Sequence, residues 1–329
     1  MSEMRVAVLY DVDDIRIERR PVPEIGEGEL LVRTRASGIC SGDVMAWYVR
    51  RKAPLVLGHE PAGTVHAVGA GVSGFACGDR VFVHHHAPCF TCRSCERKDF
   101  VQCATWRKTG IDPGGLAEFF RVPRENVGDT LLLAPNVSFE DGSLVEPLAC
   151  VVKSLRRSGV RRGDTLHVIG LGVMGVMHAL IGKALGARVT GADLLAQRAA
   201  FARTLGIAIV EDGGAKADVV ICGPGSPEAL RDAAAAVNGG GTVVMFTPLE
   251  PGVALTLDPN DLYFRDVRLV TSYSCGPNDT RDALRHIERG VVTARRLGAA
   301  LYPLEEAAQA YAALRGSRVL KPVVTFGSA

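Results

Sequence analysis

The sequence predicts a two-part α/β protein, in which a β-rich region precedes a parallel sheet covered by helices on both faces. Residues 1–130 alternate short β-rich runs with Gly, Pro and Asp, which is typical of antiparallel strands joined by turns. From residue 164 onward, strand and helix patterns alternate, and this alternation specifies a parallel sheet. A length of 329 residues also favours two domains over one.

The individual elements follow from runs of β-branched and apolar residues and from helical periodicity. The runs expected as strands in the first part are RVAVLY (5–10), ELLVRTRASG (29–38), AGTVHAVG (62–69), DRVFV (79–83) and LAEFFRVP (116–123). Those expected in the second part are DTLHVIG (164–170), ARVTGAD (187–193), IAIV (207–210), ADVVICG (217–223), GGTVVMF (240–246) and VRLVTSY (267–273), with KPVVTF (321–326) closing the chain. Helices are expected over residues 173–185, 196–205, 277–289 and 304–314.

The composition excludes several classes of protein. Hydrophobic residues make up 47% of the chain and charged residues 22%, as in a folded globular protein. The net charge of +2 argues against a nucleic-acid partner, which normally requires a clear basic excess. No uninterrupted apolar stretch of membrane-spanning length is found, and the start lacks the apolar core of a secretory signal. We therefore expect a cytoplasmic protein without a membrane partner.

The sharpest local motif is a cluster of four cysteines with C-x2-C-x2-C-x7-C spacing, within a loop-like stretch of about residues 86–106. Four thiolates at this spacing can enclose one zinc ion and leave no position for a substrate, which is typical of a structural site. An iron–sulfur cluster is the alternative, although its motifs place the fourth cysteine differently. The predicted structural zinc ligands are Cys89, Cys92, Cys95 and Cys103.

A second candidate metal site is dispersed along the chain. Cys40 stands in GICSGD, His59 and Glu60 in LGHEP, and Glu146 in LVEPLAC. A thiolate, an imidazole and a carboxylate from separate loops would leave zinc an open position for an alcohol oxygen. Each residue alone also has an ordinary structural interpretation, because single cysteines are often buried in cores and His-Glu pairs are common.

A glycine-rich turn provides the third motif. Gly170, Gly172 and Gly175, with Val173 and Met174 between them, form a GxGxxG sequence directly after one predicted strand and at the start of a helix. These glycines permit a tight turn and close approach to a pyrophosphate at the helix N-terminus. Asp193 ends the next strand, where a carboxylate would bind the adenosine ribose and repel a 2′-phosphate. The pattern therefore predicts NAD rather than NADP.

Taken together, these motifs resemble the zinc-containing medium-chain dehydrogenase/reductase family, which includes the alcohol, sorbitol and threonine dehydrogenases. The stretch GHEPAG (58–63), followed by Gly69 and Val72, matches the zinc signature of the family. The cysteine cluster, DPGGLAEF, VEPLAC, GLGVMG and the C-terminal segment occur in the family's order, so the resemblance covers essentially the whole chain.

The resemblance implies a GroES-like β-barrel catalytic domain, formed by residues 1–145 and 291–329, and a Rossmann NAD-binding domain over residues 146–290, with the active site in the cleft between them. It also implies two zinc ions per chain, one catalytic and one structural. Cys40 and His59 would bind the catalytic zinc, with Glu60 as a direct or exchangeable ligand.

The remaining roles that the resemblance implies concern the surroundings of the zinc and the cofactor. Glu146 stands where alcohol dehydrogenases place a cysteine ligand and where sorbitol-dehydrogenase-like members carry glutamate. Asp43 would orient His59 by accepting its other ring N–H. Cys150 would lie near the nicotinamide ring, Lys321 would meet the cofactor pyrophosphate, and Arg198 is assigned to cofactor binding as well.

The sequence departs from the family at the start of the proton relay. Many members carry Ser or Thr two residues after the zinc-binding cysteine, whereas this chain has Gly42, and Met45 stands near the place of the usual relay histidine. We expect the proton of the zinc-bound alcohol to leave through water, with the help of Ser41, Glu60 or a cofactor ribose hydroxyl.

The expected function is zinc-dependent, NAD-linked oxidation of a secondary alcohol of the polyol, sugar, cyclitol or amino-alcohol type, in a homodimer or homotetramer. Alternatives are a simple alcohol dehydrogenase or aldehyde reductase, a zinc-free quinone or enoyl reductase, and a non-catalytic structural protein. Other residues are open to ordinary interpretations: the tract of His84, His85 and His86 as packing or surface residues, Trp47 as either pocket wall or core, and Cys77, Cys222 and Cys275 as small core residues.

Overall fold

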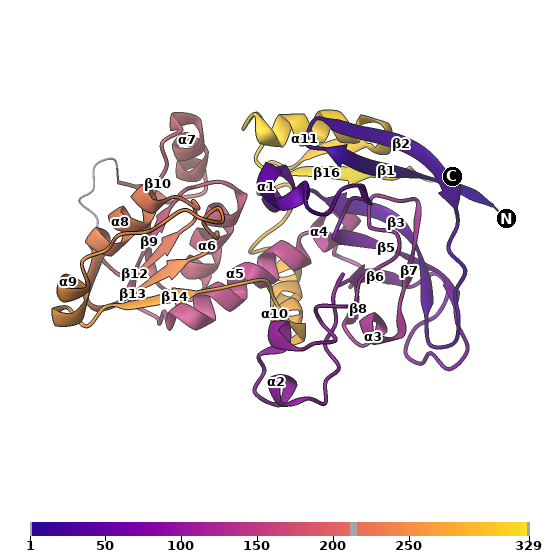
Figure 1. The fold of residues 1–329 in the computed structure, drawn as a ribbon, viewed down its shortest axis with the longest axis horizontal. Helices are drawn as coiled ribbons and strands as arrows, with labels where there is room; N and C mark the ends of the chain where they lie inside the picture. Colours follow the sequence, from indigo (N-terminus) through magenta and orange to yellow (C-terminus); the bar gives the residue numbers. More distant parts are fainter. Residues whose placement is uncertain (1, 211–215, 328–329) are drawn as a thin grey trace. The chain divides into compact units, whose positions relative to one another are not determined.

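The computed structural model describes residues 2–210 and 216–327, and the chain divides into two compact units (Figure 1). Unit 1 comprises residues 1–149 and 275–329, and unit 2 comprises residues 150–274. The second junction therefore lies earlier than the expected boundary at residue 290. The reason is that helix α10 (Pro277–Glu288) packs on unit 1, where the Thr280 hydroxyl donates a hydrogen bond to Asp129.

Unit 1 contains two sheets, one of three strands in the order β2-β1-β4 and one of seven strands in the order β15-β16-β3-β5-β6-β8, with β7 also paired to β3. Pairing is antiparallel except between β15 and β16, which are parallel. The strands of this unit are β1 (Glu3–Asp11), β2 (Asp14–Pro21), β3 (Leu30–Gly38), β4 (Leu55–Val56), β5 (Glu60–Val68), β6 (Arg80–Val83), β7 (Phe119–Val122), β8 (Thr130–Leu132), β15 (Ala300–Pro303) and β16 (Pro322–Thr325).

The register of the large sheet brings three loops to the same end of neighbouring strands. Strands β3 and β5 pair antiparallel with Gly38 opposite Glu60, so the segment after β3 and the segment before β5 lie side by side. Strand β6 continues this arrangement, because Ala62 lies opposite Phe82. Continued two residues forward from Phe82 and two residues back from Ala62, this register places His84, just after the end of β6, at the level of Glu60.

Short helices connect the strands of unit 1, and a small apolar core lies on the sheet. The core includes Leu30, Val32, Val65, Val81 and Phe120, all at or below 1% exposed. The helices are η1 (Ser41–Val44), α1 (Ala46–Val49), α2 (Arg93–Glu96), η2 (Phe100–Gln102), α3 (Arg124–Val127), α4 (Phe139–Gly142), α10, η3 (Leu304–Glu306) and α11 (Ala307–Arg315). The five runs expected as strands in this part are confirmed, whereas β2, β4, β8 and β15 were not expected.

Unit 2 is built on a six-stranded, entirely parallel sheet in the order β11-β10-β9-β12-β13-β14. The first strand of the unit lies inside the sheet, and the order reverses beside it, as in a dinucleotide-binding fold. The strands are β9 (Thr165–Ile169), β10 (Arg188–Ala192), β11 (Ala208–Ile209), β12 (Ala217–Cys222), β13 (Val237–Met245) and β14 (Arg268–Thr271). The expected parallel sheet is confirmed.

Helices join these parallel strands, and buried positions hold them on the sheet. Helix α6 is mostly buried and packs on β9 and β10, while α8 packs on β12 and β13 through Leu230 and Ala233. The helices are α6 (Val173–Ala184), α7 (Ala196–Thr204), α8 (Pro227–Ala236) and α9 (Pro259–Phe264), and α5 (Val145–Ser158) carries the chain from unit 1 into unit 2. No helix of the described residues is long and apolar enough to cross a membrane.

Candidate functional site

The four-cysteine lobe has the dimensions of a tetrahedral metal site. The Sγ–Sγ distances are 3.5 Å between Cys92 and Cys95, 3.6 Å between Cys89 and Cys103, and 3.9 Å between Cys89 and Cys95. Zinc–sulfur bonds of about 2.3 Å in a tetrahedron place the sulfurs about 3.8 Å apart, whereas a disulfide requires about 2.05 Å. All four ligand atoms lie within 4.8 Å of one another, so the residues fit zinc.

The electrostatics of this lobe also favour a cation. Burial and the neighbouring sulfurs raise the pKa of Cys95 to about 12. The Thr91 hydroxyl and backbone N–H groups lower the pKa of Cys89 to about 5. Four thiolates at this separation repel one another, so a bound cation is what would allow all of them to ionise.

The predicted catalytic ligands Cys40, His59 and Glu60 come together at the aligned ends of β3 and β5. Their ligand atoms all lie within 4.8 Å of one another. Cys40 follows β3 and caps η1, where its Sγ accepts a hydrogen bond of 3.3 Å from the Gly42 N–H. His59 directly precedes β5, after Gly58 at φ +92°, and Glu60 is the first residue of that strand. The sheet register thus assembles the set.

The Glu60 carboxylate combines a paired oxygen with an unpaired one. The ammonium of Lys321 contacts Oε2, and also donates a 2.9 Å hydrogen bond to the Ile39 carbonyl. Oε1 is buried and has no hydrogen-bond partner among the described residues. Burial raises the pKa of Glu60, while Lys321 opposes that rise. An orphaned carboxylate oxygen beside a thiol and an imidazole fits a zinc ligand.

Lys321 was expected at the cofactor pyrophosphate, but its side chain is only 1% exposed and lies on Glu60. The backbone explains this placement, because β16 pairs with β3 next to the residues that lead into Cys40. In this structure Lys321 holds Glu60 in place, and a contact with the cofactor stays a prediction.

Asp43 lies beside His59 as expected. Its Oδ2 is 3.5 Å from His59 Nδ1 and 3.4 Å from the Tyr311 hydroxyl of α11. Burial alone would lower the pKa of His59, but the charges of Asp43 and Cys40 raise it well above the usual value. Tyr311 was not singled out from the sequence, because 268 residues separate it from Asp43.

The expected relay and pocket residues lie on the short helices after Cys40. Ser41 is exposed on η1, and Met45 is partly buried at its end. The Trp47 ring contacts the Tyr48 ring edge-on at 5.7 Å between centroids. The Arg51 guanidinium lies 5.5 Å from the centroid of the Trp47 ring. The positions of these residues do not test the predicted proton relay through Ser41.

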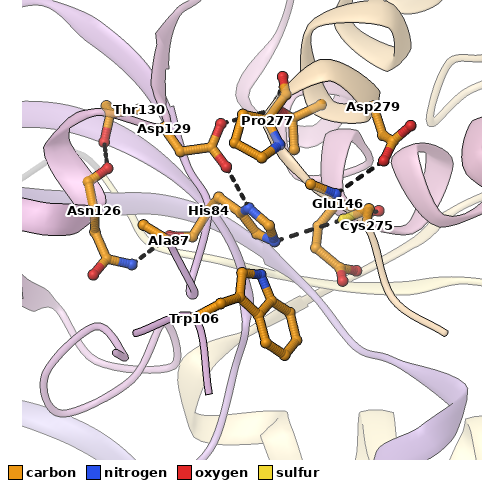
Figure 2. A network of polar contacts seen from close by, with 12 residues as sticks. His84, Ala87, Trp106, Asn126, Asp129, Thr130, Glu146, Cys275, Pro277 and Asp279 are labelled. Atoms are coloured by element: carbon orange, nitrogen blue, oxygen red, sulfur yellow. Dashed lines mark hydrogen bonds and ion pairs between the residues drawn. The ribbon is translucent and has the colours of Figure 1, made fainter. Parts of the chain in front are cut away.

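Glu146, the second residue of α5, is 5% exposed and forms a ligand set with the histidine tract. A carboxylate oxygen of Glu146 and ring nitrogens of His84 and His85 lie within 4.8 Å of one another. Figure 2 shows the side chains of Glu146 and His84. Glu146 is not part of the set formed by Cys40, His59 and Glu60. Glu146 as a ligand of the catalytic zinc therefore stays a prediction.

The cysteines expected in the core divide into two groups. Cys222 and Cys275 are fully buried, as expected. Cys77 is exposed, so the expectation is wrong for this residue. Cys77 lies in the turn between β5 and β6, where its thiol donates a 3.4 Å hydrogen bond to the carbonyl of His66.

The glycine-rich turn has the backbone that its sequence predicts. Gly170 follows β9 with φ +87°, and Gly172 caps the N-terminus of α6. A Cβ atom on Gly175 would lie 1.8 Å from the Gly170 carbonyl oxygen, so no larger residue fits there. Val173 is buried against the sheet, and Met174 is partly exposed on the first turn of α6.

Asp193 closes this turn from the end of β10. Its carboxylate accepts hydrogen bonds from the N–H groups of Leu171 at 2.6 Å and Leu195 at 2.8 Å. The Arg198 guanidinium lies 3.8 Å from the same carboxylate. Cys150 is a partly buried residue of α5. The roles of these residues in cofactor binding stay predictions.

Parallel sheet, glycine-rich turn and clustered metal ligands together define a nucleotide-linked, zinc-binding oxidoreductase. Comparison with known families agrees. The family model for the alcohol dehydrogenase GroES-like domain matches residues 26–131, and that for the zinc-binding dehydrogenase matches residues 170–289. The chain belongs to the zinc-dependent medium-chain dehydrogenase/reductase family, and it is an oxidoreductase of the alcohol dehydrogenase class.

Individual relatives are similar over most of the chain. Sorbitol dehydrogenase of Bombyx mori is 30% identical over 353 residues, covering 98% of this chain and 99% of the relative. D-altritol 5-dehydrogenase of Agrobacterium fabrum is 32% identical, with 87% and 88% covered. A candidate zinc-binding dehydrogenase from Sinorhizobium meliloti 1021, solved with NADP bound, is 26% identical with a TM-score of 0.88 over 99% of this chain and 100% of that one.

Proposed function

We propose that this enzyme oxidises a secondary alcohol to a ketone, reversibly, by transferring hydride to NAD+. The observation that carries the proposal is the set of Cys40, His59 and Glu60, whose ligand atoms lie within 4.8 Å of one another. Within this set, Glu60 Oε1 has no hydrogen-bond partner among the described residues. When bound there, zinc supplies Lewis-acid polarisation that lowers the pKa of an alcohol hydroxyl.

The residues of the chain divide the remaining work. Cys40 and His59 hold the metal, and Glu60 supplies a third ligand through a carboxylate oxygen, with Glu146 as the alternative. Asp43 orients the His59 ring, and Lys321 keeps the second oxygen of Glu60 occupied. Gly42 provides no hydroxyl for a proton relay, so we propose that the proton leaves through water near the exposed Ser41.

The metal assignment is tested by Cys40→Ser. We expect this variant to lose turnover while it keeps the zinc of the four-cysteine lobe, because the two ligand sets share no residue. Turnover at the wild-type rate would exclude Cys40 as a zinc ligand of the reaction. Ser41→Ala tests the proton route separately, and an unchanged pH–rate profile would remove Ser41 from it.

For the cofactor we propose NAD rather than NADP. The support is the buried carboxylate of Asp193 at the glycine-rich turn, which would repel a 2′-phosphate. The neighbouring Arg198 and the NADP bound to the Sinorhizobium meliloti protein point the other way. Comparing kcat/KM for NAD+ and NADP+ decides the matter, and a preference for NADP+ would refute the proposal.

For the substrate we propose a polyol or a related secondary alcohol. The relatives named above act, by their names, on sorbitol and D-altritol, and both compounds are polyols. The test is NADH production by zinc-loaded protein with a panel of polyols, inositols, amino sugars and simple alcohols. Faster turnover of simple primary alcohols than of every polyol would favour the simple alcohol dehydrogenase alternative.

We further propose a homodimer or homotetramer that works in the cytoplasm. Strand β14 ends the parallel sheet, and exposed apolar side chains lie on it and near it: Leu269 at 45%, Tyr273 at 59%, Tyr263 at 78% and Phe264 at 77%. Unpaired sheet edges and exposed aromatic residues favour self-association. Light scattering coupled to size-exclusion chromatography measures the oligomeric state. A monomer at micromolar concentration would refute the proposed homodimer or homotetramer. No disulfide joins any of the nine cysteines, all of which are among the described residues, and this suits a reducing compartment.

A further inference from the structure

Helix α11 brings a tyrosine into contact with a residue beside the proposed catalytic metal site. The hydroxyl of Tyr311 lies 3.4 Å from Asp43 Oδ2, and the same carboxylate oxygen lies 3.5 Å from His59 Nδ1. One oxygen of Asp43 therefore contacts both an imidazole and a phenol hydroxyl. The reaction proposed above gives a role to His59 and to Asp43 but none to Tyr311.

The hydroxyl of Tyr311 lies at a position that packing alone would give to phenylalanine. Tyr311 is 2% exposed and packs in an apolar core that includes Leu9, Ile39 and Leu57. Among the described residues, Asp43 is the only hydrogen-bond partner of the hydroxyl. Burying a hydroxyl costs stability unless it is hydrogen-bonded, and phenylalanine would fill the same space without that cost. The contact with Asp43 is thus the physical reason for a tyrosine here.

The chemistry of the three groups fixes the direction of these contacts. An ionised carboxylate only accepts hydrogen bonds, so the Tyr311 hydroxyl donates to Asp43. The same oxygen faces His59 Nδ1, so Nδ1 carries the ring proton and Nε2 is the nitrogen available to a metal. Both distances are at the long end of the hydrogen-bond range. The position of the carboxylate between its two neighbours therefore decides how firmly it holds the His59 ring.

Different parts of the chain supply the two sides of the Tyr311–Asp43 contact. Asp43 lies on η1, just after Cys40, and its N–H donates a 3.1 Å hydrogen bond to the Cys40 carbonyl. Tyr311 lies on α11, in the C-terminal segment that also carries Lys321, the partner of Glu60. This segment therefore contacts the surroundings of the metal ligands at two points, through Asp43 and through Glu60.

We propose that Tyr311 is a positioning residue for the catalytic metal: its hydroxyl holds the Asp43 carboxylate, which in turn orients the His59 ring. The inference rests on the proposed function, because it requires His59 to be a metal ligand. Removing the group that orients a metal-binding histidine typically weakens metal binding about 10- to 100-fold. Tyr311 acts through that group, so we expect an effect at the lower end, about tenfold.

The test is the zinc affinity of full-length Tyr311→Phe, measured by competition with a chromophoric chelator. The four-cysteine lobe stays loaded with zinc, and the signal of the catalytic site is the part that Cys40→Ser lacks. We expect Tyr311→Phe to bind zinc at the catalytic site about tenfold more weakly. Tyr302→Phe is the matched control, because Tyr302 packs against the same core and no hydrogen bond of the described residues involves its hydroxyl. The control should keep the wild-type affinity.

A double-mutant cycle separates positioning from a change in packing. Asp43→Leu removes the carboxylate, so Tyr311→Phe should cause no further loss of zinc affinity in this background. An equal loss in both backgrounds would show that Tyr311 acts through packing and would overturn the proposal. Wild-type zinc affinity in Tyr311→Phe would overturn it as well. Thermal unfolding of the zinc-depleted proteins verifies that each variant is folded.

Cobalt at the catalytic site gives a second measurement that does not depend on affinity. The d–d bands of tetrahedral cobalt respond to the orientation of the ligands, so they should shift in Tyr311→Phe and stay unchanged in Tyr302→Phe. Unchanged bands in Tyr311→Phe would contradict the positioning role. Neither measurement uses alcohol or NAD+, so a wrong substrate or cofactor leaves them valid. Equal zinc binding by Cys40→Ser and the wild type would instead refute the metal assignment of the proposed function itself.

Discussion

The substitution Gly175→Ala probes the glycine-rich turn most directly. The added Cβ would lie 1.8 Å from the Gly170 carbonyl oxygen, and contacts below 3.0 Å are essentially never seen, so the turn must move away from α6 by more than 1 Å. Overpacking of this kind costs about 1–3 kcal/mol. We expect the thermal unfolding temperature to fall by several degrees. A displaced turn should also weaken NADH binding about 5- to 150-fold if the same free energy is lost on binding.

Gly172→Ala is the matched control in the same turn. A Cβ there meets nothing closer than the Arg198 guanidinium at 3.8 Å, and the backbone at φ −62° suits alanine. This variant should keep the wild-type unfolding temperature and weaken NADH binding only, because the cofactor is expected to approach this residue closely. NADH fluorescence titration and differential scanning calorimetry measure both quantities. If Gly175→Ala unfolds at the wild-type temperature, the packing argument fails.

Two further substitutions test buried groups. Lys321→Met leaves the Glu60 carboxylate buried without its ammonium partner, so we expect the free energy of unfolding of zinc-depleted protein, measured by urea denaturation, to fall by about 3–5 kcal/mol. A fall of less than about 1 kcal/mol would contradict this reasoning. Adding Glu60→Gln to this variant should restore part of the lost stability, because it removes the buried charge. Burial lowers the pKa of His178 from 6.5 to about 4, so the unfolded chain binds the extra proton between these pH values and stability falls as pH drops from 6.5 toward 4. Between pH 7 and pH 4 the free energy of unfolding of His178→Gln should fall by about 3 kcal/mol less than that of the wild type. Equal pH profiles of stability would rule out His178 as the source of this pH dependence.

Local patterns were sufficient to predict most of the strands, four of the helices and two of the motifs. The alternating runs of unit 2 predicted its parallel sheet, because hydrophobic periodicity reports directly on which face of a strand or helix is buried. The cysteine cluster and the turn from Gly170 to Gly175 were also found, since each lies within a short segment whose geometry depends on spacing. The boundary at residue 290 was placed too late, because the pattern of α10 does not reveal which unit it packs on.

The sequence by itself determined the family and located the four-cysteine lobe, and it predicted Cys40, His59, Glu60 and Glu146 as ligands of a second metal site. Only the tertiary structure decided which groups surround them. Lys321 meets Glu60 across 261 residues, and Cys275 meets His84 across 191. Such contacts depend on strand register and on which helix packs where, and one position of slippage turns a side chain to the opposite face of the sheet. The association of Glu146 with His84 and His85 is of the same kind, so no local pattern could have predicted it.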